Sequence, residues 1–256
     1  MTKKLLLFQA TLGFEILFCL FANKIEAVPV GNPASPAILQ EGIFLSDAGW
    51  TQPRLGFLED FTLNHPLAGD SLHAVSAEGF SAAGALIWSL FERLDLSLLL
   101  GSGNYYFQMV QGDEALTAQV NGGLIWYGEA RLVLLEVEDT TFSAFGEAGG
   151  WNWMRGPFYI DSHPVANRAA LKMRFWEVGV TLSQQVGLFS PYGGVVVMQS
   201  RWKMSETNTG IYYFHQKYPV GPLLGCTISK SSKILLNLEW RGWIENAFTL
   251  SGELRF

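Results

Sequence analysis

Hydrophobic and polar residues alternate with a period of two along most of the chain after about residue 53. The alternation is clearest in residues 246–256, where Leu250 and Leu254 fall on one face and Glu253 and Arg255 on the other. A period of two is that of a β-strand, whose side chains point alternately to its two sides. The sequence therefore predicts strands that separate an apolar environment from a polar one.

The same pattern predicts about ten strands, separated by connections that alternate in length. Short turns are expected near residues 92, 138, 186 and 231, and long loops at 64–78, 155–167 and 203–220. In the strand predicted at 168–183, the apolar residues change parity between Phe175 and Trp176, which predicts a β-bulge there. The strands are expected near residues 54–63, 79–90, 94–100, 119–134, 141–153, 168–183, 192–202, 223–229, 233–241 and 246–256.

Loops sorted by length in this way are typical of outer-membrane barrels, which have short periplasmic turns and longer external loops. No stretch after residue 27 is long and apolar enough for a transmembrane helix. A membrane chain without spanning helices must close its sheet, because lipid cannot satisfy the hydrogen bonds of an open edge. We therefore predict an all-β fold over residues 53–256, a transmembrane closed antiparallel up-and-down β-barrel of about ten strands, with eight or twelve as alternatives.

The first 27 residues have the pattern of a secretory signal peptide. Lys3 and Lys4 precede a mostly apolar run, and a small residue, Ala27, suits the cleavage site. A membrane anchor is the alternative, but polar residues interrupt the run and it is short for a span. Residues 28–52 are rich in Pro, Gly and Ala and are interpreted as a periplasmic lead-in.

Composition narrows the possible functions. The formal net charge is −6 and there is no basic run, so nucleic acid is not expected as a partner. Cys226 is the only cysteine after the leader, so no internal disulfide is expected. The many aromatic residues suit an interface between membrane and water. The tryptophans expected to lie there are Trp88, Trp126, Trp151, Trp153, Trp176, Trp202, Trp240 and Trp243.

Five stretches resemble the chlamydial major outer membrane protein family of porins. They are PVGNPA at 29–34, RLGFLEDF at 54–61, FERLDLSLLLG at 91–101, SPYGGV at 190–195 and GELRF at 252–256. The resemblance implies an outer-membrane diffusion channel that is also a major surface component. The chain departs from the family in being short and in lacking the family's many cysteines.

Strand parity predicts which polar side chains face the inside of the barrel. The functional interpretation is a porin, in which lumen charges select small hydrophilic solutes and ions; the alternative is that the charges pair with one another and fill the lumen. The predicted pore-lining residues are Arg54, Asp60, Asp95, Gln119, Asn121, Glu129, Arg131, Lys172, Arg174, Glu177, Asn237, Glu239, Arg241, Glu253 and Arg255.

The predicted location is the bacterial outer membrane, and the expected partners follow from it. They are the lipid bilayer, the barrel assembly machinery with Phe256 as its signal, and a second copy of the chain. A non-conducting structural or adhesive barrel acting through its external loops is the alternative function. We expect no enzymatic activity, no cofactor and no metal, because His65, His73, His163 and His215 lie near predicted loops without a catalytic motif.

Overall fold

The computed structural model describes residues 52–69, 72–90, 93–161, 163–206, 210–231 and 234–255. The predicted leader, the lead-in before residue 52, and Phe256 lie outside the described residues. The described part forms twelve strands in one antiparallel sheet. No helix in these ranges is long and apolar enough to span a bilayer. The strands are β1 (Gln52–Gly69), β2 (Leu72–Leu90), β3 (Leu94–Gln111), β4 (Glu114–Asn121), β5 (Leu124–Val137), β6 (Thr140–Ile160), β7 (His163–Gln184), β8 (Phe189–Glu206), β9 (Gly210–Gln216), β10 (Val220–Ser231), β11 (Ile234–Arg241) and β12 (Asn246–Arg255).

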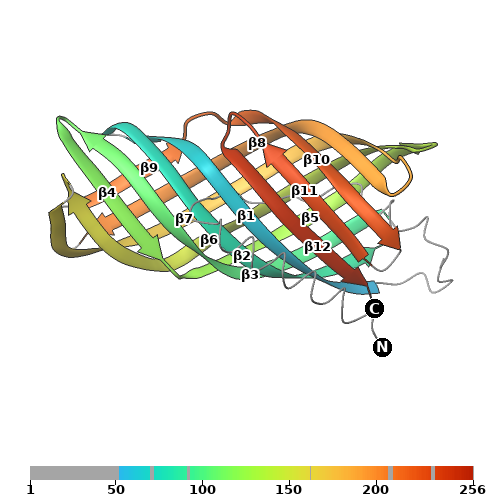
Figure 1. The fold of residues 1–256 in the computed structure, drawn as a ribbon, viewed down its shortest axis with the longest axis horizontal. Helices are drawn as coiled ribbons and strands as arrows, with labels where there is room; N and C mark the ends of the chain where they lie inside the picture. The colour runs from blue at the N-terminus through green and yellow to red at the C-terminus, as the bar shows by residue number, and fades with distance from the viewer. Residues whose placement is uncertain are drawn as a thin grey trace, which may run out of the picture.

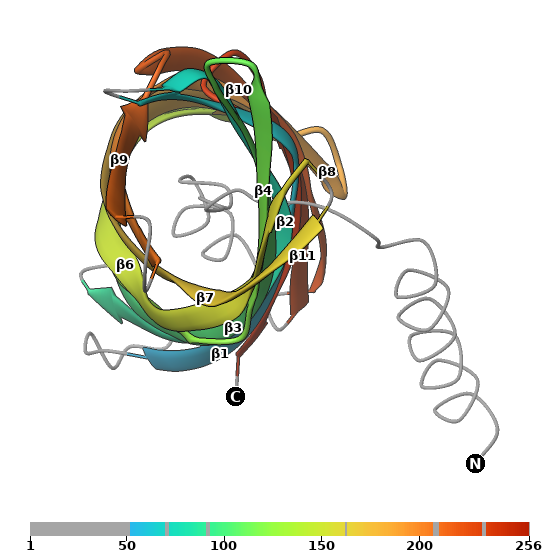
Figure 2. The same ribbon diagram turned by 90° about the vertical axis from the view of Figure 1, so that its left-hand side faces the viewer.

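The sheet closes on itself because the first and last strands pair. The β1–β12 ladder runs from Arg54 opposite Arg255 to Asn64 opposite Asn246. Elsewhere strands that follow one another in sequence pair, except that β4 and β5 do not pair with each other and neither do β9 and β10. The connectivity is up-and-down, and Figure 2 shows the resulting ring. The fold class is therefore confirmed as a closed antiparallel β-barrel.

Two positions around the barrel are each occupied by two strands that lie end to end. Both β4 and β5 pair with β3 on one side and β6 on the other, and Gly122 and Gly123 separate them. These two glycines have φ values of 69° and 92°, a conformation that residues with a Cβ rarely adopt. In the same way, β9 and β10 both pair with β8.

The number of strands around the barrel changes along its axis. The hairpin of β11 and β12 is short and ends part of the way along the wall. Beyond it, β1 pairs directly with β9, with Leu67–Gly69 opposite Phe214–Gln216. The barrel therefore has ten strands around the half that contains β11 and β12 and eight around the half that contains β4 and β9 (Figure 1). We call these the ten-stranded half and the eight-stranded half.

The short turns are found where the sequence predicts them, but the long loops are not. Strands β2 and β3 are separated only by residues 91–93, and β5 and β6 only by 138–139. The prediction of loops at 64–78, 155–167 and 203–220 is wrong for most of each range, because long hairpins occupy them. Proline and histidine there suggested chain breaks, but His65 and Pro66 continue β1 after a register shift.

The alternation of inward and outward side chains continues into the eight-stranded half. There the inward side chains are apolar and the outward ones polar, the reverse of the ten-stranded half. On β3, Asp95 and Ser97 face inward in the ten-stranded half, and Tyr105 and Phe107 follow on the same inward parity. The prediction of a β-bulge between Phe175 and Trp176 is wrong, because the apolar residues change face there while the strand keeps its register. Both the β6–β7 and the β7–β8 ladders pass this point without a register shift.

Glycine at position 101 allows close approach of β2 and β3. A Cβ built there would lie 2.1 Å from the carbonyl oxygen of Ala82, whereas a Cβ at the neighbouring Gly84 meets nothing within 4 Å. We expect Gly101→Ala to lower the free energy of unfolding by roughly 1–3 kcal/mol, since the backbone must move to admit the methyl group. Gly84→Ala is the matched control and should change it by less than about 1 kcal/mol. Urea unfolding followed by tryptophan fluorescence measures both, and equal effects would contradict the close approach.

Candidate functional site

The interior of the ten-stranded half is filled with charged side chains that are buried from solvent. Among the described residues it holds eight carboxylates and three arginines. The acidic residues therefore outnumber the basic ones by a wide margin. They are Asp60, Asp95, Glu129, Glu147, Glu177, Glu239, Glu245 and Glu253, with Arg54, Arg131 and Arg241.

Two of the arginines form one ion-pair cluster with acids from three strands. Arg54 pairs with Asp95, and its Nη1 lies 3.0 Å from Oε2 of Glu253. Arg131 places Nη1 2.6 Å from the other oxygen of Glu253 and also contacts Glu129. Glu253 therefore bridges the two arginines, and the cluster ties β1, β3, β5 and β12 together across the lumen.

Arg241 on β11 is the centre of a second cluster. Its guanidinium lies 3.4–3.7 Å from carboxylate oxygens of Glu177, Glu239 and Glu245, and 3.5 Å from Asp60. Asp60 also accepts a hydrogen bond of 2.7 Å from the Thr249 hydroxyl. One buried cation therefore faces four carboxylates.

A row of glutamates lies at one level of the barrel. Glu129 is opposite Glu147 in the β5–β6 ladder, and Glu147 is opposite Glu177 in the β6–β7 ladder. Neither carboxylate oxygen of Glu147 has a hydrogen-bond partner among the described residues. The row therefore gathers three acidic side chains at one level, and Glu177 among them lies 3.7 Å from Arg241.

A chain of polar contacts marks the level where the barrel narrows. One ring nitrogen of His65 lies 3.2 Å from Glu245, and the other lies 2.8 Å from the amide oxygen of Gln216. Ser200 donates to the same oxygen and accepts from the indole N–H of Trp202, each at 2.9 Å. Because Glu245 follows the end of β11, these contacts attach the tip of the short hairpin to the eight-stranded wall.

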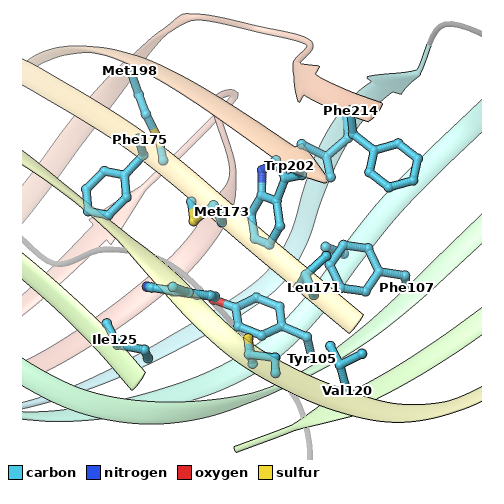
Figure 3. Close-up of a cluster of buried hydrophobic side chains, with 14 of the residues drawn as sticks. Tyr105, Phe107, Val120, Ile125, Leu171, Met173, Phe175, Met198, Trp202 and Phe214 are labelled. Carbon is cyan, nitrogen blue, oxygen red and sulfur yellow. The ribbon is translucent and has the colours of Figure 1, made fainter. Parts of the chain in front are cut away.

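The interior of the eight-stranded half is apolar and aromatic. Trp202 packs edge-on against Trp151, with ring centroids 5.7 Å apart, and against Tyr105 and Phe107 at 5.5 Å each. Phe214 stacks on Phe107 at 6.4 Å. Figure 3 shows the rings of Tyr105, Phe107, Trp202 and Phe214 gathered from several strands, with Leu171 and Met173 beside them. An eight-stranded barrel is just wide enough for such side chains to fill it.

The structure places most of the predicted pore-lining residues inside the barrel, but it does not show them around an open passage. Arg255 lies on β12, and its side chain is outside what the structure describes. The inward and buried residues are Arg54, Asp60, Asp95, Glu129, Arg131, Glu177, Asn237, Glu239, Arg241 and Glu253.

The inward orientation predicted for Gln119, Asn121, Lys172 and Arg174 is wrong, because all four lie exposed on the outer face. They belong to the eight-stranded half, where the outer face is polar. Trp151 and Trp202, which were expected at the membrane interface, are buried inside for the same reason.

Three interior residues were not singled out from the sequence. Glu147 stands between Gly146 and Ala148, and residues this small give no alternation from which the orientation of Glu147 could be inferred. Glu245 lies in a turn, where alternation gives no information. Tyr192, whose hydroxyl lies 2.7 Å from Glu239, starts a strand whose facing the sequence does not assign.

The outer surface also divides into two zones. Around the ten-stranded half every strand exposes a large apolar side chain, and the outer face of the eight-stranded half is largely polar and basic. The apolar belt comprises Leu55, Phe57, Trp88, Leu96, Leu98, Leu100, Trp126, Leu132, Leu134, Phe142, Trp176, Val178, Val180, Leu182, Val195, Leu224, Ile228, Ile234, Leu236, Leu238, Phe248 and Leu254. The exposed polar residues of the other zone include Asn104, Gln108, Gln119, Asn121, Arg155, Lys172, Arg174, Gln199, Arg201, Lys203 and His215.

Histidines and acids do not form a metal-binding group within the described ranges. His65 is buried in β1, whereas His163 and His215 are exposed on β7 and β9. Asp161, which precedes His163 closely in sequence, accepts a hydrogen bond of 3.0 Å from the backbone N–H of Ala115. Its carboxylate therefore links the turn between β6 and β7 to β4. The side chain of His73 lies outside the described part.

No protein-family model and no curated protein sequence matches the chain. Among solved structures, it is similar to the outer membrane protease OmpT of Escherichia coli, with 11% identity over 81% of this chain and 95% of that one, and a TM-score of 0.42. It is also similar to the translocator domain of the autotransporter NalP of Neisseria meningitidis, with 8% identity, 82% and 90% coverage and a TM-score of 0.45. Pseudomonas putida OprB has 7% identity, 90% and 100% coverage and a TM-score of 0.19. At these TM-scores the likenesses carry no functional argument.

Proposed function

We propose that the chain is a structural β-barrel of the bacterial outer membrane, whose lumen is closed to solutes in the conformation described. The apolar belt around the ten-stranded half supports the membrane placement, because lipid-facing surfaces of such barrels are apolar bands. The polar outer face of the eight-stranded half then projects beyond the hydrocarbon layer. Membership of the chlamydial major outer membrane protein family stays a proposal that rests on the five short stretches.

The filled interior carries the proposal of a closed lumen. Buried ion pairs occupy the ten-stranded half, and packed aromatic rings occupy the eight-stranded half. A solute would have to separate both layers. Breaking buried ion pairs costs several kcal/mol for each uncompensated charge, so passage is strongly disfavoured.

A cation-selective pore is the second candidate, and the interior charge favours it over a general porin. Eight buried carboxylates face three arginines among the described residues. Rings of Asp and Glu are the usual filters of cation channels. This function requires the aromatic layer to open, for example through rearrangement around Trp202.

Planar-bilayer recording of the refolded chain without its first 27 residues separates the two candidates. We expect no stable single-channel steps, because both layers of side chains block the lumen. A bacterial porin reconstituted in parallel is the positive control, and vesicle flotation establishes that the protein has inserted. Stable steps would contradict the closed barrel. A reversal potential in a salt gradient that indicates cation preference would then support the second candidate.

A further inference from the structure

Four basic side chains gather on the outer face of β7 and β8. Lys172 is directly opposite Lys203 in the ladder, and Arg174 is directly opposite Arg201. All four are exposed. We call these four residues the basic patch.

Like charges directly opposite each other in an antiparallel pair are destabilising. The ion pairs of the described residues lie inside the barrel, and none of them includes a residue of the basic patch. His215 is opposite Arg201 on the next strand, β9, so no acid flanks the patch on that side. The arrangement therefore holds uncompensated positive charge that an anion would neutralise.

The patch borders the apolar belt directly. On β7 the outward residues Val180, Val178 and Trp176 are followed by Arg174 and Lys172. The corresponding residues on β8 are Val195 and Val197, then Gln199, Arg201 and Lys203. Trp176 donates its indole N–H to Gln199 at 3.1 Å, which marks the border between the two zones.

Aromatic rings and a glycine position two of the cations. The guanidinium of Arg174 lies 5.5 Å from the ring centroid of Trp126, and the ammonium of Lys203 lies 5.8 Å from that of Tyr213. Arg174 reaches Trp126 across β6 because Gly150 has no side chain there. A Cβ at Gly150 would lie 2.5 Å from the Arg174 guanidinium. Arg174 also donates to Asn152 at 3.2 Å.

We propose that the basic patch binds the phosphate groups of an anionic lipid headgroup, with the acyl chains of that lipid lying along the adjacent apolar belt. Guanidinium groups match phosphate geometry through paired hydrogen bonds, and lysines add charge. The continuity of cationic and apolar surface on the same two strands fits an amphiphile with a phosphorylated head. The inference rests on the proposed membrane placement.

The test uses the refolded chain in a neutral detergent, with lipid A, a bisphosphorylated glycolipid, as the probe. We expect the double variant R174Q/R201Q to bind lipid A roughly 25-fold more weakly, at about fivefold for each charge near a lipid surface. In detergent without the probe, the double variant should melt at the same or a higher temperature, because a like-charge pair has been removed. If the arginines had only a structural role, the double variant would instead melt at a lower temperature than the wild type.

Arg93→Gln is the control, since Arg93 is exposed in the turn between β2 and β3, at the opposite end of the barrel. It should leave the affinity for lipid A unchanged. Equal weakening by R93Q and by R174Q/R201Q would overturn the patch as a site. If polyphosphate or inorganic phosphate stabilised the wild type as much as lipid A does, the assignment of a lipid as the ligand would be overturned.

Flotation of the wild-type chain with neutral phosphatidylcholine vesicles tests the membrane placement separately. A chain that floats but shows no lipid A binding refutes the patch and leaves the placement intact. A chain that does not float refutes the placement on which the lipid assignment depends.

Discussion

Replacing Arg241 with methionine is expected to lower the free energy of unfolding by roughly 3–5 kcal/mol, the cost of leaving buried charges without their partner. Arg241 faces Asp60, Glu177, Glu239 and Glu245 at 3.4–3.7 Å, inside a part of the barrel already rich in acid. Methionine fills a similar volume and removes the charge. Urea unfolding of the refolded chain in vesicles, followed by tryptophan fluorescence, measures the loss.

Arg155→Met is the matched control for that measurement, because Arg155 is exposed on the outer face of β6. A change within about 0.5 kcal/mol is expected there. Adding Glu177→Gln to the Arg241→Met chain should restore part of the lost stability, since Glu177 pairs with Arg241 at 3.7 Å and becomes uncompensated without it. Equal losses in the two arginine variants would refute the charge network as a source of stability.

Replacing Trp202 with alanine is the second change with a large expected effect, a loss of roughly 3–5 kcal/mol. Trp202 is 1% exposed and packs against Trp151, Tyr105 and Phe107. Its removal leaves a cavity in the aromatic layer and takes away the indole donor of Ser200. Thermal unfolding in detergent, compared with the wild type, gives the size of the effect.

Trp243→Ala provides the comparison, because Trp243 is 77% exposed. Its loss should cost less than about 1 kcal/mol. The Trp202→Ala chain also tests the aromatic layer as a barrier in bilayer recordings. Unchanged stability of Trp202→Ala would mean that the rings do not pack as a core.

Most inward residues of the ten-stranded half could be predicted from the sequence, whereas the side-chain orientation in the eight-stranded half could not. In β11 and β12 the apolar face and the charged face keep the same parity throughout, so Glu239, Arg241 and Glu253 were correctly assigned to the inside. The prediction of inward residues requires that polar side chains face the lumen along the whole barrel. Lys172 and Arg174 do not meet this requirement, because the barrel there has an apolar interior and a polar exterior.

One sequence signal for the exchange was present. On β3 the residues in phase with Asp95 are polar as far as Ser97 and aromatic from Tyr105, with apolar Leu99 and two glycines between them. The sequence pattern does not, however, show which charged side chains form ion pairs with each other. Arg54, Asp95 and Glu253 meet only when the barrel closes, and a spacing of two along each strand carries no information about which strands will face each other across the lumen.

The pairing of β1 with β9 and β12, which follow it late in the sequence, also sets the order in which native contacts can form. Strand β1 pairs with β12 along most of its length and with β9 only at Leu67–Gly69, so the first strand must wait for the last two strands before its edge is covered. Contacts between residues so far apart in sequence make folding slow. During that wait, β1 presents an open edge that other chains can pair with. Ordering of the β11–β12 hairpin is therefore expected to be the rate-limiting step, and protection of the assembling sheet matters most just before it.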